Sequence, residues 1–120
     1  MTDEVLTPVD IERKLIDVTR LLDSVPGQIK IRGKAAAEAK HAAKKAEATA
    51  FVKHKRGTGD GRPPSDELCK RLAYLDCEQL WLDADVADND VEAAKEAGRD
   101  YREASQNWRS INVNTRALVQ

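Results

Sequence analysis

The feature that most constrains the fold is the stretch from residue 65 to residue 118, which contains no proline and only one glycine, Gly98. Because proline and glycine are the two residues that most disfavour a helix interior, this stretch predicts one long helix. At 1.5 Å per residue, such a helix would be about 80 Å long. The rest of the 120-residue chain must pack along it. The sequence therefore predicts an all-α fold.

Two further helices are predicted upstream, over residues 8–24 and 28–56. The pair Thr7-Pro8 is typical of an N-cap followed by the first helical position. The pair Pro26-Gly27 predicts a break or a sharp kink between the two helices. The first helix has an apolar face with steps of four and three residues. That face comprises Ile11, Leu15, Val18, Leu22 and Val25.

The second helix is rich in alanine, which has the highest helix propensity and lets a neighbouring helix approach closely. One row of its alanines comprises Ala35, Ala39, Ala42 and Ala46, with Ala36, Ala43 and Ala50 alongside. Residues 57–65 then form a loop, because three glycines and two prolines interrupt any helix there. Ser65 is placed to cap the last helix, over residues 66–118.

These elements predict a long antiparallel helical hairpin, similar to a coiled coil, within a single domain over residues 1–120. A turn centred near Gly61 pairs residues whose numbers sum to roughly 122. Pro26 then lies opposite residue 96, within one turn of Gly98. The N-terminal helix thus packs on the distal half of the last helix.

The last helix carries an apolar stripe with near-heptad spacing, which is typical of coiled coils. Its members are Leu68, Leu72, Leu75, Leu82, Val86, Ala93, Ala97, Tyr101, Ala104, Trp108, Ile111, Thr115 and Leu118. A two-helix layer leaves part of such a stripe uncovered, so we expect a homo-oligomer. The expected interface residues are Leu82, Val86, Tyr101, Trp108, Ile111 and Leu118. We interpret Cys69 and Cys77 as small apolar residues.

Charge is strongly separated along the chain, although the net charge is only −1. Residues 29–62 hold ten basic and three acidic residues, and residues 66–103 hold twelve acidic and five basic ones. An antiparallel hairpin would let these segments neutralise each other. The register predicts four pairs, namely Lys30–Glu92, Lys34–Asp88, Lys40–Asp83 and Lys44–Glu78.

The tip of the hairpin has its own excess of basic residues around the glycine loop. They include Lys53, His54, Lys55, Arg56 and Arg62. Such a tip suits contacts with phosphates, which dominate the affinity for nucleic acids. The alternative is a solvated helix end that only keeps the protein soluble.

No catalytic constellation is present. His41 and His54 have no nucleophile near them in sequence, and Gly57-x-Gly59-x-Gly61 lacks the strand and the lysine of a phosphate loop. We therefore expect no enzyme, no cofactor and no metal site. No apolar run is long enough to span a bilayer, and the N-terminus does not resemble a signal peptide, so we expect a cytoplasmic protein.

The hairpin turn carries a resemblance to a known family. A lysine- and alanine-rich helix ends in Lys53-His54-Lys55-Arg56-Gly57-Thr58-Gly59-Asp60-Gly61. A long helix follows, changes from acidic to aromatic, and has a late Trp108-Arg109-Ser110-Ile111-Asn112 segment. In helix order, turn and aromatic placement, residues 35–118 resemble the UvsY-like family of phage recombination mediators.

The resemblance implies a small helical subunit that forms a ring and binds single-stranded DNA. Such a ring helps a RecA-like recombinase to replace single-strand-binding protein on that DNA. The family's functional basic residues correspond most nearly to Lys53, Lys55 and Arg56, with Lys44 and Lys45 two to three turns earlier. If the chain is phage-encoded, it would act in the host cytoplasm.

The residues leave a second hypothesis open. The chain would then be a structural protein, such as a coiled-coil scaffold or a virion-assembly chaperone that binds another protein. This hypothesis needs only the apolar stripe and treats the tip charges as solubilising.

Overall fold

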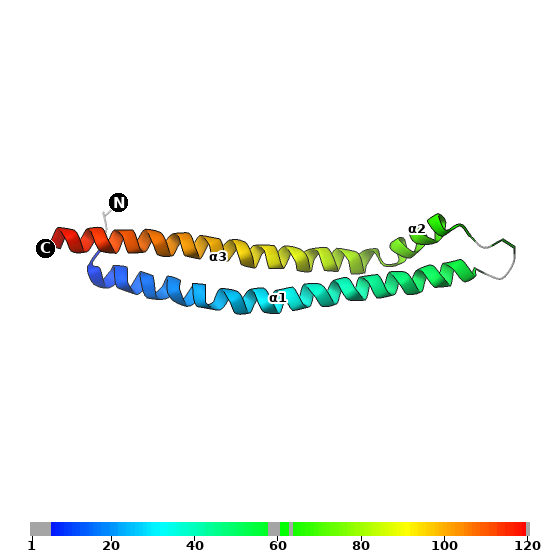
Figure 1. The fold of residues 1–120 in the computed structure, drawn as a ribbon, viewed down its shortest axis with the longest axis horizontal. Helices are drawn as coiled ribbons and strands as arrows, with labels where there is room; N and C mark the ends of the chain where they lie inside the picture. The colour runs from blue at the N-terminus through cyan, green and yellow to red at the C-terminus, as the bar shows by residue number, and fades with distance from the viewer. Residues whose placement is uncertain (1–5, 58–60, 63, 120) are drawn as a thin grey trace. The chain divides into compact units, whose positions relative to one another are not determined.

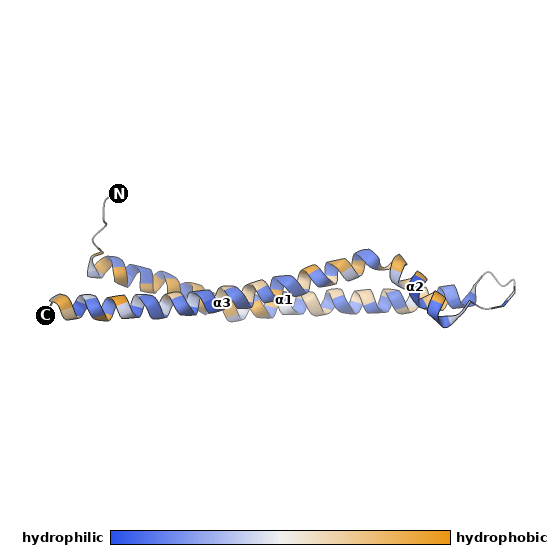
Figure 2. Cartoon of the chain, turned by 90° about the horizontal axis from the view of Figure 1, so that it is seen from above, coloured by the Kyte–Doolittle hydropathy of each residue, from blue (hydrophilic) through white to orange (hydrophobic). Residues whose placement is uncertain are grey.

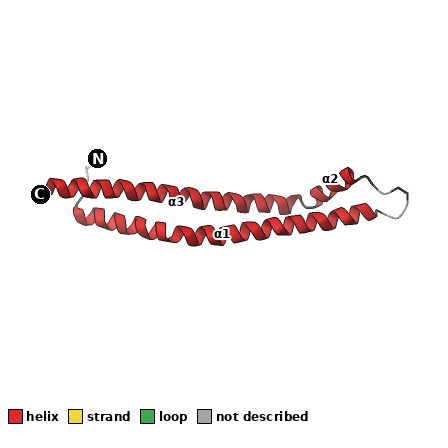
Figure 3. Ribbon diagram, in the orientation of Figure 1, coloured by secondary structure: helices red, strands yellow, loops and turns green. Residues whose placement is uncertain are grey.

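The computed structural model describes residues 6–57, 61–62 and 64–119 of the chain. These residues form three α-helices and no strand (Figure 3). The helices are α1 (Pro8–Arg56), α2 (Asp66–Asp76) and α3 (Glu78–Val119). The all-α prediction is confirmed, and α1 ends where the predicted loop begins.

Helix α1 starts with the predicted Thr7 cap, to which Asp10 adds a return hydrogen bond. Thr7 Oγ1 accepts a hydrogen bond from the Asp10 amide, and Asp10 Oδ2 accepts one from the Thr7 amide, both at 3.2 Å. These two bonds satisfy amides that have no partner within the helix. The hydrogen bonds from Thr7 lower the pKa of the Asp10 carboxyl.

The predicted break at Pro26 is wrong, because α1 continues through it. Proline removes one backbone hydrogen bond and disfavours the preceding turn, at a cost of about 3 kcal/mol. The apolar residues before and after it, Leu22, Val25 and Ile29, are all half-buried. Packing on both sides of the proline thus holds the helix together. The two predicted helices, 8–24 and 28–56, therefore form one continuous helix.

The predicted single helix over residues 66–118 is also corrected, because it is interrupted at Cys77. Cys77 has φ −110° and ψ 12°, and its amide bonds to the carbonyl oxygens of Ala73 and Tyr74. The inward-facing residues from Cys69 to Trp81 follow each other at steps of four. Each such step turns about 40° beyond a full helical turn. In one straight helix, these inward-facing residues would therefore turn progressively away from α1. We attribute the interruption at Cys77 to this rotation, because the break lets the residues on both sides of it face α1.

The chain divides into two compact units. Unit 1 comprises Met1–Lys30 and Glu92–Gln120, and unit 2 comprises Ile31–Val91. Within each unit, α1 lies antiparallel to the opposing helices (Figure 1). In the colouring by hydropathy, apolar positions are interspersed with polar ones along every helix (Figure 2).

Unit 1 pairs the first part of α1 with the last part of α3. The predicted apolar face of α1 is confirmed, since Ile11 is fully buried and the other four members are half-buried. Arg116 of α3 donates to Glu12 of α1 at 3.3 Å. This contact joins residues near opposite ends of the chain, as an antiparallel register requires.

The stripe on α3 is rotated from the predicted one. The inward-facing residues in unit 1 are Ala94, Gly98, Tyr101, Ser105, Trp108, Asn112 and Thr115, at alternating steps of four and three. Tyr101, Trp108 and Thr115 were predicted. Ala93 and Leu118 are instead exposed, because small Ala94, Gly98 and Ser105 face α1 in this register.

The buried interior of unit 2 consists of small side chains. Its buried residues are Ala36, Ala43, Cys69, Ala73, Cys77 and Ala84. Of the predicted alanine rows, the one starting at Ala36 faces inward, and Ala35 and Ala42 are exposed. Both cysteines are free and buried, and burial raises the pKa of the Cys77 thiol. Arg32 donates to the Asp90 carbonyl at 3.2 Å, which agrees with the predicted register.

At Gly98 the two helices of unit 1 approach each other closely. A Cβ atom built on Gly98 would lie 2.9 Å from Val25 Cγ1, closer than Cβ atoms approach other atoms in proteins. Val25 is β-branched and its side chain has little rotational freedom. Gly98 is therefore needed for this approach, and its contact with the residue before Pro26 agrees with the predicted register.

We predict that Gly98→Ala lowers the free energy of unfolding by about 1–3 kcal/mol, because the added methyl group overpacks the contact with Val25. Urea unfolding followed by circular dichroism measures this change. The matched control is Gly27→Ala on α1 of the same unit, where nothing lies within 4 Å of the added atom. Alanine should stabilise that helix position by about 0.5–1 kcal/mol. A Gly98→Ala protein as stable as Gly27→Ala would contradict the assigned contact.

Candidate nucleic-acid interface

The hairpin tip is shaped by the end of α1. Gly57 has φ +60°, a conformation that glycine adopts without strain, and its amide bonds to the His54 carbonyl at 3.1 Å. Gly61 also has a positive φ of 95°. Residues 58–60 of the predicted loop lie outside the described part of the chain. Ser65 caps α2 as predicted, since its hydroxyl accepts the Leu68 amide at 3.2 Å.

Lys55 links the end of α1 to the start of α2. Its Nζ atom lies 2.7 Å from Asp66 Oδ1 and donates to the Pro64 carbonyl at 2.9 Å. The hydrogen bond to Asp66 raises the pKa of Lys55, and the same bond lowers the pKa of Asp66. Lys55 therefore clamps the end of α1 to the start of α2, and its charge already has a partner.

His54 is also engaged within the tip. Its Nε2 atom lies 2.6 Å from Asp76 Oδ2, at the last residue of α2. The His54 side chain is only 27% exposed. Together with Lys55, it holds α2 against α1 at both ends of the short helix. Two of the seven predicted nucleic-acid-binding residues thus have structural contacts.

The other five predicted residues are open to solvent. Lys44, Lys45, Lys53, Arg56 and Arg62 are all exposed. None forms an ion pair with another described residue. Lys53 and Arg56 lie in the last turn of α1, where positive charge also complements the helix dipole.

The four predicted cross-arm ion pairs do not form, although all eight residues are described. Within unit 2, the basic arm (α1 residues 31–56) holds eight basic and two acidic residues, a net charge of +6. The acidic arm (residues 66–91) holds eight acidic and two basic residues, a net charge of −6. Across the two arms, Lys55 pairs with Asp66 and His54 hydrogen-bonds to Asp76. Most charge on each arm therefore stays available to solvent or to a partner.

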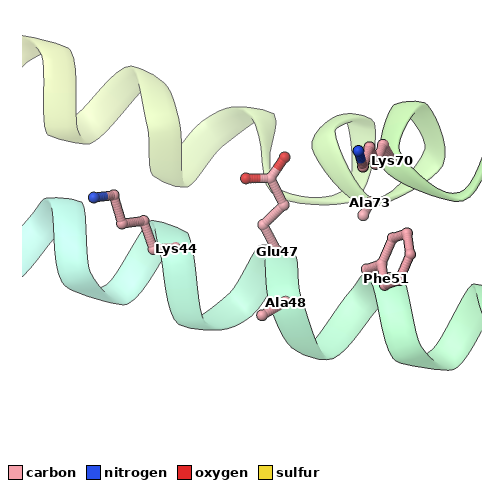
Figure 4. Close-up of a pocket in the computed structure, with 6 residues that line it drawn as sticks. All are labelled: Lys44, Glu47, Ala48, Phe51, Lys70 and Ala73. Carbon is pink, nitrogen blue, oxygen red and sulfur yellow. The ribbon is translucent and has the colours of Figure 1, made fainter. Parts of the chain in front are cut away.

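An apolar groove of about 370 Å³ lies between α1 and α2 in unit 2 (Figure 4). It is lined by Lys44, Glu47, Ala48, Phe51, Lys70 and Ala73. The sequence analysis placed no site here, because the groove exists only once α2 is set against α1. The one available signal was Phe51, the only phenylalanine of the chain.

The predicted interface residues fall into two groups. Leu82, Val86, Ile111 and Leu118 are exposed, at 37–88%. Tyr101 and Trp108 are half-buried on the inward-facing row of unit 1. Trp81, a further aromatic residue, is half-buried in unit 2, and its Nε1 atom is shielded from solvent without a hydrogen-bond partner.

The described residues contain no cluster of three or more side chains suited to hold a metal ion. Within that same part of the chain, no helix has the length and apolarity needed to cross a bilayer. No protein-family model, curated protein or solved structure matches the chain. The resemblance to UvsY-like proteins therefore rests on the sequence features alone, and what it implies is a proposal.

We predict that the Lys55–Asp66 clamp makes stability depend on pH in the acid range. Because the folded-state pKa of Asp66 is lowered, its contribution is present above the ordinary value of 3.8 and is lost as pH falls through the folded pKa. Wild type should be more stable than Asp66→Asn at pH 7, and the difference should shrink toward pH 2. Thermal melts at several pH values measure it.

The control for the clamp is Glu67→Gln, which removes a neighbouring carboxylate whose ion pair with Arg71 lies within α2. Its difference from wild type should be small, since exposed pairs along a helix contribute little. A constant difference between wild type and Asp66→Asn from pH 7 to pH 2 would contradict the role of the Asp66 charge.

Proposed function

We propose that the chain is a non-enzymatic, single-stranded-DNA-binding protein that works as a homo-oligomer. The observation that carries this proposal is the set of exposed cations on the basic arm and at the tip. These are Lys44, Lys45, Lys53, Arg56 and Arg62, which have no ion pair with a described residue. Cations that are not neutralised internally are available to phosphates.

The chemistry of these cations favours a polyanion. From Lys44 to Arg56 they extend along about 18 Å of helix. Each phosphate contact releases condensed counterions, and this release supplies most of the sequence-independent affinity for DNA. Lysine side chains serve this purpose as flexible point charges. The choice of single-stranded DNA as the polyanion comes from the resemblance to UvsY-like proteins.

The same resemblance supports a role as a recombination mediator. In that role the homo-oligomer would help a RecA-like recombinase to replace single-strand-binding protein. Several subunits would multiply a weak patch through multivalency, since each further contact becomes intramolecular. We place this activity in the cytoplasm, and in the host cytoplasm if the chain is phage-encoded.

The second candidate function is a structural or virion-assembly scaffold, or a chaperone, that binds another protein. The exposed aliphatic side chains favour it, since Leu82 is 54% exposed and Leu118 is 88% exposed. Leu82 and Val86, one turn apart on α3, together expose apolar surface of the kind that protein contacts cover. In this function the basic tip would only maintain solubility.

DNA binding is tested with the triple variant Lys45→Gln, Lys53→Gln and Arg56→Gln. We expect weaker binding of a fluorescent single-stranded oligonucleotide. The slope of log K against log salt should become less steep by about 2, because three phosphate contacts are lost at roughly 0.7 each. Fluorescence anisotropy over a range of salt concentrations measures both quantities.

The matched control is Lys14→Gln, Arg102→Gln and Arg109→Gln, three exposed cations of unit 1. It changes the net charge equally and should leave the salt slope near that of wild type. Equal losses in both triple variants would mean that only overall charge matters. If wild type does not bind the oligonucleotide at low salt, the DNA-binding proposal is wrong and the scaffold function is favoured.

A further inference from the structure

The groove of unit 2, defined above, combines an apolar floor with a basic edge. Phe51 of α1 points toward Ala73 of α2 across it, and Ala48 also lines it (Figure 4). Lys44 and Lys70 also line it, and Glu47 is the one acidic residue that does so. Both lysines are exposed and have no ion pair with a described residue. The groove therefore fits an aliphatic side chain that carries acidic neighbours.

Such side chains occur on α3 of the same unit. Leu82 is 54% exposed and Val86, one turn later, is 52% exposed. Ala84 lies between them and is buried, so these two side chains point away from α1. The exposed residues Asp83 and Asp85 flank them. We call Leu82, Asp83, Asp85 and Val86 the ridge.

The charges decide which surfaces can meet. Two ridges facing each other would bring four aspartates together, and two grooves would bring four lysines together. Like charges placed opposite each other across an interface are repulsive. A ridge against a groove instead joins the −6 arm to the +6 arm. It also covers exposed apolar surface on both sides.

We propose that the ridge of one copy docks into the groove of a second copy. Leu82 and Val86 would contact Phe51 and the alanines, and the two aspartates would face Lys44 and Lys70. Each copy carries both surfaces, so the contact is head-to-tail and can be repeated. The inference rests on the homo-oligomer of the proposed function and does not depend on DNA binding. Lys44 would serve the interface, which leaves Lys45, Lys53, Arg56 and Arg62 for phosphates.

Two variants separate the halves of this interface. The groove variant is Lys44→Glu with Lys70→Glu, and the ridge variant is Leu82→Gln with Val86→Gln. All four positions are exposed, so both variants should fold, and circular dichroism verifies this. The matched control is Ile16→Gln with Ile31→Gln, which removes two equally exposed aliphatic residues outside the ridge.

Sedimentation velocity gives the test. Wild type and the control should associate at low salt. They should dissociate toward the 13.3 kDa monomer in about 1 M salt, where the Debye length is about 3 Å. Each variant alone should remain monomeric. Their mixture should form a complex of two chains and no larger species, because one intact ridge then meets one intact groove.

Several results would overturn the interface. These are a wild type that is monomeric at low salt, a variant that assembles like wild type, or monomeric variants that fail to associate when mixed. The DNA proposal is judged separately by anisotropy. A monomer that binds DNA would end the interface proposal alone, and complementing variants without DNA binding would end the DNA proposal alone.

Discussion

The close approach of α1 to the opposing helices, through small side chains, is the constraint on which the rest of the structure depends. Gly98 admits Val25 in unit 1, and alanine and cysteine fill the interior of unit 2. The largest fully buried side chains are Ile11 and Cys69. Apart from Ile11, the buried hydrophobic residues are alanine and cysteine, so this interior holds few large aliphatic side chains. Leucines and valines of α2 and α3 are consequently left on the outside, where they are available to a partner.

The charge distribution follows the same logic. The two arms of unit 2 carry +6 and −6, yet few of these charges pair across the hairpin. The pairs that form are concentrated at the tip, where Lys55 and His54 fix the short helix α2. Exposed ion pairs contribute little to stability, so the fold gains little from neutralising the rest. The unpaired charges leave one arm strongly basic and the other strongly acidic at the surface of unit 2.

Sequence patterns predicted the elements better than their interruptions. Thr7, Ser65 and the glycine loop marked helix ends correctly, because capping and turn chemistry act locally. Pro26 failed as a marker because packing on both sides of it outweighed one lost hydrogen bond. The interruption at Cys77 has neither proline nor glycine beside it, since it results from how α2 is set against α1. In the candidate site, seven binding residues were predicted; five of them are exposed, whereas the contacts of His54 and Lys55 were not predicted.

By itself, the sequence determined the all-α class, the reversal at the glycine loop, the antiparallel register and the separation of charge. These properties depend on local propensity, on hydrophobic periodicity and on counting charged residues along the chain. Only the tertiary structure decided which alanine row faces inward, where α2 ends, which tip cations are engaged, and that Phe51 borders a groove. Each of these depends on the rotation of one helix against another. A rotation of one residue position exchanges buried and exposed side chains while leaving the periodic pattern almost unchanged.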